Sequence, residues 1–411
     1  MLYNRVMNVY ISGISGTGMG ALALFASDAG ENIYGSDLSK GAVAGELLGR
    51  KIPVQFGAQD GSFLQKCYDE TGVDWFVYTS ALPQDHAELQ LAQKLGIHTA
   101  KRDELINYLI EKQGAKLVAV AGTHGKTTTT GMLVWATQQL KIPASYLVGT
   151  TLPFAGAGHY DQNAKFFLYE ADEYDRNFLA FHPWVAAITT VTYDHPDIYK
   201  TEAEYQEAFA QFERQSKQII RGGEIDSRLT LPGEIRRVDA TLALKALKMM
   251  APDTPDEQII AALNSFPGVG RRFERITSGV YSDYGHHPEE VATTVQIATE
   301  EAKLQGKKGV IVIYQPHQNT RQHQVKQGYK NAFQGVDHIY WLPTFLTRED
   351  PNLPILTPDD LIKILNNPEI AEAAEVDDAL ATKLKDYQKQ GYLILLMTAG
   401  PADAWLRQIF A

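Results

Sequence analysis

The chain has 411 residues and a formal net charge of −11, with 44% hydrophobic and 21% charged residues. This composition is typical of a folded globular protein with two or three domains. The negative balance argues against binding to nucleic acid or to an anionic membrane, because both favour basic surfaces. Cys67 is the single cysteine, which excludes a disulfide framework and a CxxC metal site.

The chain starts MLYNRVMNVYISGISG, which runs directly into a strand pattern and lacks the apolar region of a signal peptide. No apolar run approaches the ~18 residues of a transmembrane helix. We therefore expect a cytoplasmic protein.

Strands alternate with helical patterns along the whole chain, which predicts an α/β fold with three domains. We place the domains at 1–112, 113–265 and 266–411. In chain order the expected strands are 8–12, 32–37, 75–82, 118–121, 165–175, 184–195, 279–285, 309–317, 338–345 and 392–400. The clearest expected helices are 21–30, 86–96, 128–140, 239–250, 255–266, 288–305 and 401–410. The segment 214–237 reads as one or two strands with tight turns.

The first glycine turn follows strand 8–12 and precedes a helix. Gly13, Gly16 and Gly18 let the backbone approach a phosphate, and the helix N-terminus adds partial positive charge. Asp37 ends the next strand, a position that commonly meets a ribose or a base. The spacing is GxxGxG, so a nicotinamide cofactor is not specifically indicated.

The second turn, GTHGKTT at 122–128, predicts a nucleoside triphosphate site. Backbone amides of this turn can wrap phosphate oxygens, Lys126 can neutralise charge between phosphates, and Thr127 can bind Mg²⁺. Val120 stands where the usual GxxxxGK[ST] signature has its first glycine.

Two polar segments follow the next strands. Glu170, Asp172, Glu173 and Asp175 lie in YEADEYD, at the end of a strand where α/β sites assemble. A carboxylate there can hold Mg²⁺, while Asp175 reads as a solvated side chain. His195 ends the following strand and is a candidate ligand or orienting residue.

The motifs GISGTGMGALA, GSD, TSAL, AGTHGKTTTT, EADE.D..F, DH.D.Y, RRFE, DYGHHP and QPH..TR occur here in the order seen in Mur ligases. The chain resembles this family from residue 11 to about 325, most closely the branch that adds L-alanine to UDP-N-acetylmuramate. The resemblance implies a Rossmann-like N-terminal domain for the UDP-sugar, a P-loop central domain for ATP, and a Rossmann-like C-terminal domain that presents the amino acid. It also implies a role in peptidoglycan synthesis. We expect a monomer or a homodimer.

The resemblance also assigns site residues. It implies Lys126, His195 and Arg272 as catalytic residues and Thr127, Glu170 and His195 as metal ligands. The implied ATP contacts are Gly122, Thr123, His124, Gly125, Lys126, Thr127, Thr128, Arg272 and Asp283. The implied UDP-sugar contacts are Gly13, Ser15, Gly16, Thr17, Gly18, Met19, Asp37 and Ser80. The implied amino-acid site is Tyr284, His286 and Arg321.

Three departures from the family pattern bear on specificity. Ile235, Arg236 and Asp239 replace residues that seat the adenine, and the central domain is shorter than usual. Gln318 stands where the alanine-adding enzymes carry an arginine, so bidentate pairing with a carboxylate is lost at that position.

Alternatives to alanine addition stay open, and one is the addition of a different amino acid. Tyr174 in EADEYD also resembles the recycling ligase that attaches a murein tripeptide to the same nucleotide sugar. A relative that binds UDP-sugar without catalysis is a further alternative, which the retention of Lys126, Thr127, Glu170 and His195 counts against.

Overall fold

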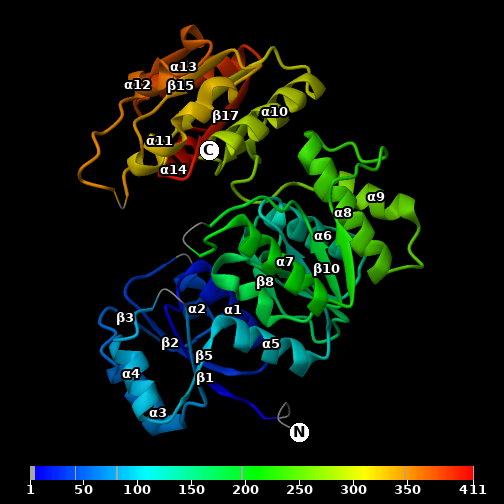
Figure 1. Ribbon diagram of the computed structural model, residues 1–411, viewed down its shortest axis with the longest axis vertical. Coiled ribbons are helices and arrows are strands. Elements are labelled where there is room, and N and C mark those ends of the chain that lie inside the picture. The colour runs from blue at the N-terminus through cyan, green and yellow to red at the C-terminus, as the bar shows by residue number, and fades with distance from the viewer. Residues whose placement is uncertain (1–4, 42, 80–81, 196–197, 348, 411) are drawn as a thin grey trace. The chain divides into compact units, whose positions relative to one another are not determined.

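The structure is a computed structural model that describes residues 5–41, 43–79, 82–195, 198–347 and 349–410. It confirms the α/β class, with three mostly parallel sheets in succession along the chain (Figure 1). Across these described ranges, none of the helices combines the length and the apolar character needed to cross a bilayer.

The first sheet has five parallel strands in the order β3-β2-β1-β4-β5. Its order reverses beside β1, and such switch points are where open α/β sheets bind ligands. The strands are β1 Asn8–Ser12, β2 Asn32–Asp37, β3 Val54–Phe56, β4 Trp75–Tyr78 and β5 His98–Lys101. The helices are α1 Thr17–Asp28, α2 Ala44–Gly49, α3 Ser62–Thr71, α4 Ala87–Lys94 and α5 Arg102–Gln113.

The second sheet has six strands in the order β11-β10-β6-β9-β7-β8, with β8 antiparallel to β7. The strand that leads into the threonine-rich turn, β6, lies between β10 and β9. The strands are β6 Lys116–Ala121, β7 Ala144–Leu152, β8 Gly156–His159, β9 Phe166–Glu170, β10 Val185–Ile188 and β11 Gln218–Arg221. The helices are α6 Lys126–Gln139, η1 Tyr174–Ala180, α7 Glu202–Gln215, α8 Glu234–Met250 and α9 Asp256–Asn264.

The third sheet has the order β12-β13-β17-β14-β15-β16, with only β12 antiparallel to its neighbour. Its strands are β12 Glu274–Thr277, β13 Val280–Asp283, β14 Val310–Gln315, β15 His338–Trp341, β16 Ala371–Ala373 and β17 Leu393–Thr398. The helices are α10 Pro288–Leu304, α11 Asn319–Val325, η2 Lys326–Asn331, α12 Pro358–Ile362, η3 Pro368–Ile370, α13 Asp378–Lys389 and α14 Ala402–Phe410.

Contacts divide the chain into two compact units. One contains residues 1–229 and 238–266, and the other contains residues 230–237 and 267–411. The first two sheets therefore share one unit, which holds both predicted phosphate-binding turns. The predicted boundary near residue 112 stays a prediction, because the first two sheets also share a core.

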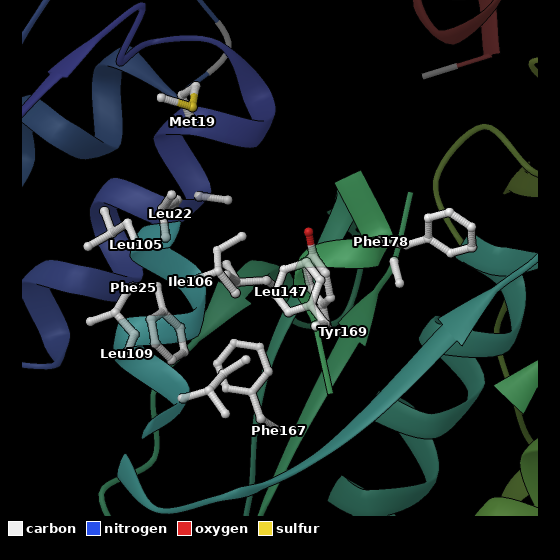
Figure 2. Close-up of a cluster of buried hydrophobic side chains, with 14 of the residues drawn as sticks. Met19, Leu22, Phe25, Leu105, Ile106, Leu109, Leu147, Phe167, Tyr169 and Phe178 are labelled. Atoms are coloured by element: carbon white, nitrogen blue, oxygen red, sulfur yellow. The ribbon is translucent and has the colours of Figure 1, made fainter. Parts of the chain in front are cut away.

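Helix α1 forms much of that shared core. Phe25 on α1 is 1% exposed, and its ring contacts Phe167 on β9 and Tyr160 after β8, with centroids 5.2 and 5.5 Å away. Figure 2 shows Met19, Leu22 and Phe25 on one side of this cluster and Leu147, Phe167, Tyr169 and Phe178 on the other. Leu105, Ile106 and Leu109 of α5 complete it. The start of α1 is thereby fixed relative to the second sheet.

A buried carboxylate joins the strands beneath the glycine turn. Glu88 on α4 is 1% exposed and accepts hydrogen bonds from the hydroxyls of Tyr10, Ser12 and Ser36 at 2.6, 2.9 and 2.8 Å. Ser12 ends β1 and Ser36 lies near the end of β2, so Glu88 ties together the two strand ends that carry the turn. The amphipathic pattern of 86–96 predicts this helix but gives no sign of a buried acid.

The prediction of one or two strands with tight turns for 214–237 is wrong for residues 234–237. The structure has one strand there, β11, and residues 234–237 form the first turn of α8. Gly233, with φ 86°, precedes the helix, and the inward-facing residues from Ala240 to Met250 continue the helical spacing. The charged residues of 234–237 therefore belong to a helix start.

Replacing Phe25 with alanine should reduce the free energy of unfolding by about 3–5 kcal/mol, because it removes the ring that fills the space between α1 and β9. Chemical denaturation followed by circular dichroism measures this. Leu38→Ala is the control, since Leu38 is 71% exposed and its loss should change stability by less than about 0.5 kcal/mol. Equal effects of the two substitutions would contradict the shared core.

Replacing Glu88 with alanine should destabilise the protein by about 2–4 kcal/mol, because three buried hydroxyls lose their common acceptor. The same denaturation experiment tests this. Glu46→Ala, whose side chain is 54% exposed, should have little effect. A Glu88→Ala protein as stable as the wild type would mean that these hydroxyls find other acceptors.

Candidate functional site

The glycine turn after β1 closes onto β2. The amide of Gly13 donates to Ser36 O at 2.8 Å, and Gly13 has a φ of 76°, which favours glycine. Asp37 Oδ2 accepts from the amide of Ser15 at 2.9 Å. One oxygen of the predicted ribose-binding carboxylate therefore holds the turn in place. Gly16 precedes α1, whose start has no side-chain cap.

The threonine-rich turn requires its two glycines. Gly122 has φ 138°, and a Cβ there would lie 2.0 Å from Thr189 Oγ1. Gly125 has φ 85°, and a Cβ there would lie 2.5 Å from Asp239 Oδ1. No side chain fits at either position, so only glycine allows this path of the backbone. Without side chains there, the backbone amides of the turn can approach a phosphate closely. Helix α6 begins directly afterwards, at Lys126.

Lys126 lies inside this turn beside Glu173, one of the four acids at the end of β9 or after it. Its Nζ donates to Gly122 O at 2.6 Å and lies 2.7 Å from Glu173 Oε2. Glu173 has a side-chain exposure of 1%. Burial by itself would raise the pKa of Glu173, but the hydrogen bond from His195 and the charge of Lys126 outweigh it and lower that pKa. Glu173 thus balances the lysine charge within the turn.

Thr127 and Glu170 are brought together as predicted for metal ligands. The Thr127 hydroxyl donates to Glu170 Oε1 at 2.6 Å, and the amide of Gly149 donates to Glu170 Oε2 at 2.8 Å. A hydroxyl and a carboxylate in contact fit Mg²⁺, which uses one or two protein ligands and keeps several waters. In the described parts of the chain, no three His, Cys, Asp or Glu side chains gather as a metal site by themselves.

His195 is placed against Glu173, with Nε2 3.6 Å from Glu173 Oε1. The hydrogen bond with Glu173 raises the pKa of His195 above its ordinary value. Its φ is 57°, uncommon for a residue with a side chain, and such strain collects at functional sites. Tyr199 helps to fix this arrangement because its hydroxyl donates to Glu173 O at 2.6 Å.

The unit of residues 267–411 contains the other predicted site residues. Asp283 ends β13 and is buried, and its carboxylate accepts from the amides of Phe273 and Gly285, both at 2.6 Å. Burial raises the pKa of Asp283, against the charge of Arg272. The Arg272 guanidinium lies 5.5 Å from the ring centre of Tyr284. These predicted residues therefore share the carboxyl end of β13.

The residues predicted to meet the amino acid form a second cluster in that unit. The rings of His286 and His317 lie 5.4 Å apart, and Arg321 Nη1 is 3.3 Å from His317 Nδ1. Burial lowers the pKa of His286, which keeps it neutral near pH 7. Gln318 has a φ of 62° and hydrogen-bonds through its backbone to Phe345. His317 and Gln318 both lie within the sequence motif QPH..TR, which also contains Arg321.

Some predicted contacts fall elsewhere. Ser80 lies outside the described residues. Asp239, which replaces an adenine-seating residue, is buried and lies against Gly125, whereas Ile235 and Arg236 belong to the other compact unit. The roles assigned to individual residues stay predictions.

Three family models match the chain in succession. They are the catalytic domain of the Mur ligase family at residues 8–113, the Mur ligase middle domain at 120–221, and the Mur ligase glutamate ligase domain at 271–400. Together they cover most of the sequence and correspond in order to the three sheets.

Individual relatives agree with these models. A UDP-N-acetylmuramate–L-alanine ligase from Campylobacter jejuni subsp. doylei is 28% identical over 84% of this chain and 87% of its own. A UDP-N-acetylmuramate–L-alanine ligase from Lactobacillus acidophilus is 27% identical over 93% of this chain and 95% of its own.

Solved structures show the same fold. A UDP-N-acetylmuramate–alanine ligase from Thermotoga maritima has a TM-score of 0.74 at 22% identity, covering 98% of both chains. A murein peptide ligase from Psychrobacter arcticus has a TM-score of 0.57 at 21% identity, again over 98% of both. With its three matched domains, its three sheets and the geometry of its threonine-rich turn, the chain belongs to the Mur ligase family.

Proposed function

We propose that the chain is an ATP-dependent ligase that joins L-alanine to the carboxylate of UDP-N-acetylmuramate in peptidoglycan synthesis. The observation that carries this proposal is the pairing of Lys126 with a phosphate-wrapping turn and of Thr127 with Glu170, in the same compact unit as the glycine turn. The names of the relatives from Campylobacter and Lactobacillus support the substrate.

The first step activates the sugar carboxylate. One carboxylate oxygen attacks the γ-phosphorus of ATP, the bond to the β-phosphate oxygen breaks, and ADP leaves. This step needs charge neutralisation and positioning rather than covalent help, which Lys126 and the amides of the turn can supply. Thr127 and Glu170 would hold Mg²⁺, which adds charge neutralisation at the phosphates when it is bound.

The second step forms the amide. The amine of the amino acid attacks the carbonyl carbon of the acyl phosphate, the carbon–oxygen bond to phosphate breaks, and a proton leaves the nitrogen. His286 suits the acceptance of that proton, because burial keeps it neutral. Arg321, the arginine of the predicted amino-acid site, is the residue that would pair with the carboxylate of the incoming amino acid.

A second candidate is the ligase that attaches a murein tripeptide to the same sugar. Gln318 favours it, because glutamine cannot pair bidentately with the carboxylate of a small amino acid. The likeness to the Psychrobacter structure shows the fold alone and does not choose between the two acceptors.

Phosphate release from ATP should depend on UDP-N-acetylmuramate and on L-alanine together. The experiment adds each of the twenty amino acids and a murein tripeptide singly, and a coupled assay follows phosphate. Phosphate release that requires the tripeptide would identify the chain as the recycling ligase instead. No release with any acceptor, despite binding of the UDP-sugar, would favour a relative without catalysis.

Replacing Lys126 with alanine should lower phosphate release on the order of 10²–10³-fold, because the transferred phosphoryl group loses its main cation. Binding of the UDP-sugar, measured by calorimetry, should stay within about twofold. Lys165→Ala, which removes an exposed lysine of the same compact unit, is the matched control. Undiminished turnover in Lys126→Ala would show that the threonine-rich turn does not hold the phosphates.

A further inference from the structure

Three polar side chains in the unit of residues 267–411 are wholly buried and have no part in the motifs or in the proposed reaction. They are Tyr314 on β14, Gln322 on α11 and Tyr329 on η2, and each is 0% exposed. A buried polar group is costly unless it is hydrogen-bonded. The partners of these three side chains therefore show which parts of the unit they hold in place.

The three side chains form one chain of contacts between two backbone carbonyls. The Tyr314 hydroxyl lies 3.0 Å from His286 O and 2.6 Å from the Tyr329 hydroxyl. The Tyr329 hydroxyl lies 2.8 Å from Gln322 Oε1, and Gln322 Nε2 donates to His317 O at 3.0 Å. The chain thus connects the backbones of the two histidines whose rings lie 5.4 Å apart.

The hydroxyl of Tyr329 stands in the middle of this chain and couples its two ends. Burial raises the pKa of Tyr314 and of Tyr329, so each hydroxyl carries its proton near neutral pH. Two protons serve three oxygen–oxygen contacts, because the outer oxygens, His286 O and Gln322 Oε1, can only accept. The Tyr329 proton supports either Tyr314 or Gln322, so a change at one end alters the hydrogen bonding at the other.

One end of the chain holds the residue that suits the acceptance of the amine proton. His286 Nδ1 lies 3.1 Å from Tyr284 O, and since a carbonyl only accepts, Nδ1 carries the hydrogen of the neutral ring and Nε2 is the free base. The amide of His286 donates to Glu290 Oε2 at 3.0 Å. With Tyr314 at the carbonyl of His286, both polar backbone groups of that residue are held, which fixes the direction of the ring.

The other end of the chain holds the segment that leads to the arginine. Gln318 has a φ of 62°, a backbone conformation that costs free energy and needs support from its surroundings. Gln322 supports it on both sides, because its amide donates to Gln318 O at 3.1 Å and its side chain donates to His317 O. Arg321, the residue before Gln322, lies 3.3 Å from His317 Nδ1 through Nη1.

We propose that Tyr329 is a positioning residue of the amino-acid site, which sets the spacing of His286 and Arg321 through this chain of buried hydrogen bonds. This inference rests on the proposed function, because it takes the cluster of His286, His317 and Arg321 as the place where the acceptor amine binds. Since Tyr329 is wholly buried, it acts on the acceptor only through these residues.

Steady-state kinetics of Tyr329→Phe test the proposal. Phenylalanine keeps the ring that packs against Trp341, with centroids 5.3 Å apart, and removes only the hydroxyl. We expect KM for the acceptor amino acid to rise about 3- to 10-fold, the effect of losing one buried hydrogen bond. KM for ATP and for UDP-N-acetylmuramate should stay within about twofold. An unchanged acceptor KM, or an equal rise for all three substrates, would overturn the inference.

Tyr281→Phe is the matched control. Tyr281 is a buried tyrosine of the same unit, and its hydroxyl donates to Glu301 Oε1 at 2.9 Å, outside the chain of contacts. This substitution should leave all three KM values within about twofold of the wild type. If it raised the acceptor KM as much as Tyr329→Phe does, the effect would come from the loss of any buried hydroxyl, and the inference would be wrong.

A second variant and a double variant test the chain itself. Tyr314→Phe alone should raise the acceptor KM by a similar factor, which tests the proposal even if Tyr329→Phe folds poorly. When both hydroxyls are removed, the acceptor KM should match that of the more affected single variant to within about twofold, because the two act through one chain. Effects that multiply would show two independent hydroxyls and contradict the coupling.

Nuclear magnetic resonance of the histidine rings separates this inference from the proposed function. The Cε1–H signals of His286 and His317, assigned with the variants His286→Gln and His317→Gln, should both shift in Tyr329→Phe and in neither case in Tyr281→Phe. These shifts in a wild-type background without acceptor-dependent phosphate release would overturn the proposed function and retain the coupling of the two histidines. Acceptor-dependent release together with unshifted signals would overturn this inference alone.

Discussion

The packing of α1 against the second sheet is the constraint on which the site in this protein depends. The helix starts at the glycine turn and carries Phe25 on its inner face, where the ring meets Phe167 and Tyr160. Because interiors are closely packed, this contact leaves little freedom for the helix start to move relative to β9. In the proposed reaction one turn presents the nucleotide sugar and the other presents ATP, so their reacting groups would depend on this shared core for alignment.

Charge balance is the second organising feature. The chain is acidic overall, and its predicted phosphate sites rely on a few local cations and on backbone amides. Within the threonine-rich turn, Lys126 and His195 face Glu173, while Thr127 holds Glu170. Each buried acid has a donor, which avoids the cost of an unpaired buried charge. In the proposed reaction a triphosphate in this turn would share Lys126 with Glu173.

The residues predicted to select the amino acid belong to a different part of the chain. The His286, His317 and Arg321 cluster and the buried Asp283 belong to the unit of residues 267–411. Gln318, with its left-handed backbone, follows His317 in the chain and lacks the charge of an arginine. The family assignment therefore fixes the type of reaction more firmly than the acceptor, for which alanine and a murein tripeptide remain distinct proposals.

The sequence by itself determined the α/β class, the order of the three sheets and the position of both glycine-containing turns, because strand periodicity, glycine positions and the Gly-Lys-Thr motif are local signals. It could not place Glu173 on Lys126 or Glu88 beneath the glycine turn. These residues lie on segments whose local pattern is that of an ordinary strand end or amphipathic helix. Only tertiary packing decides which buried charge meets which turn, since that depends on contacts between residues far apart in the chain.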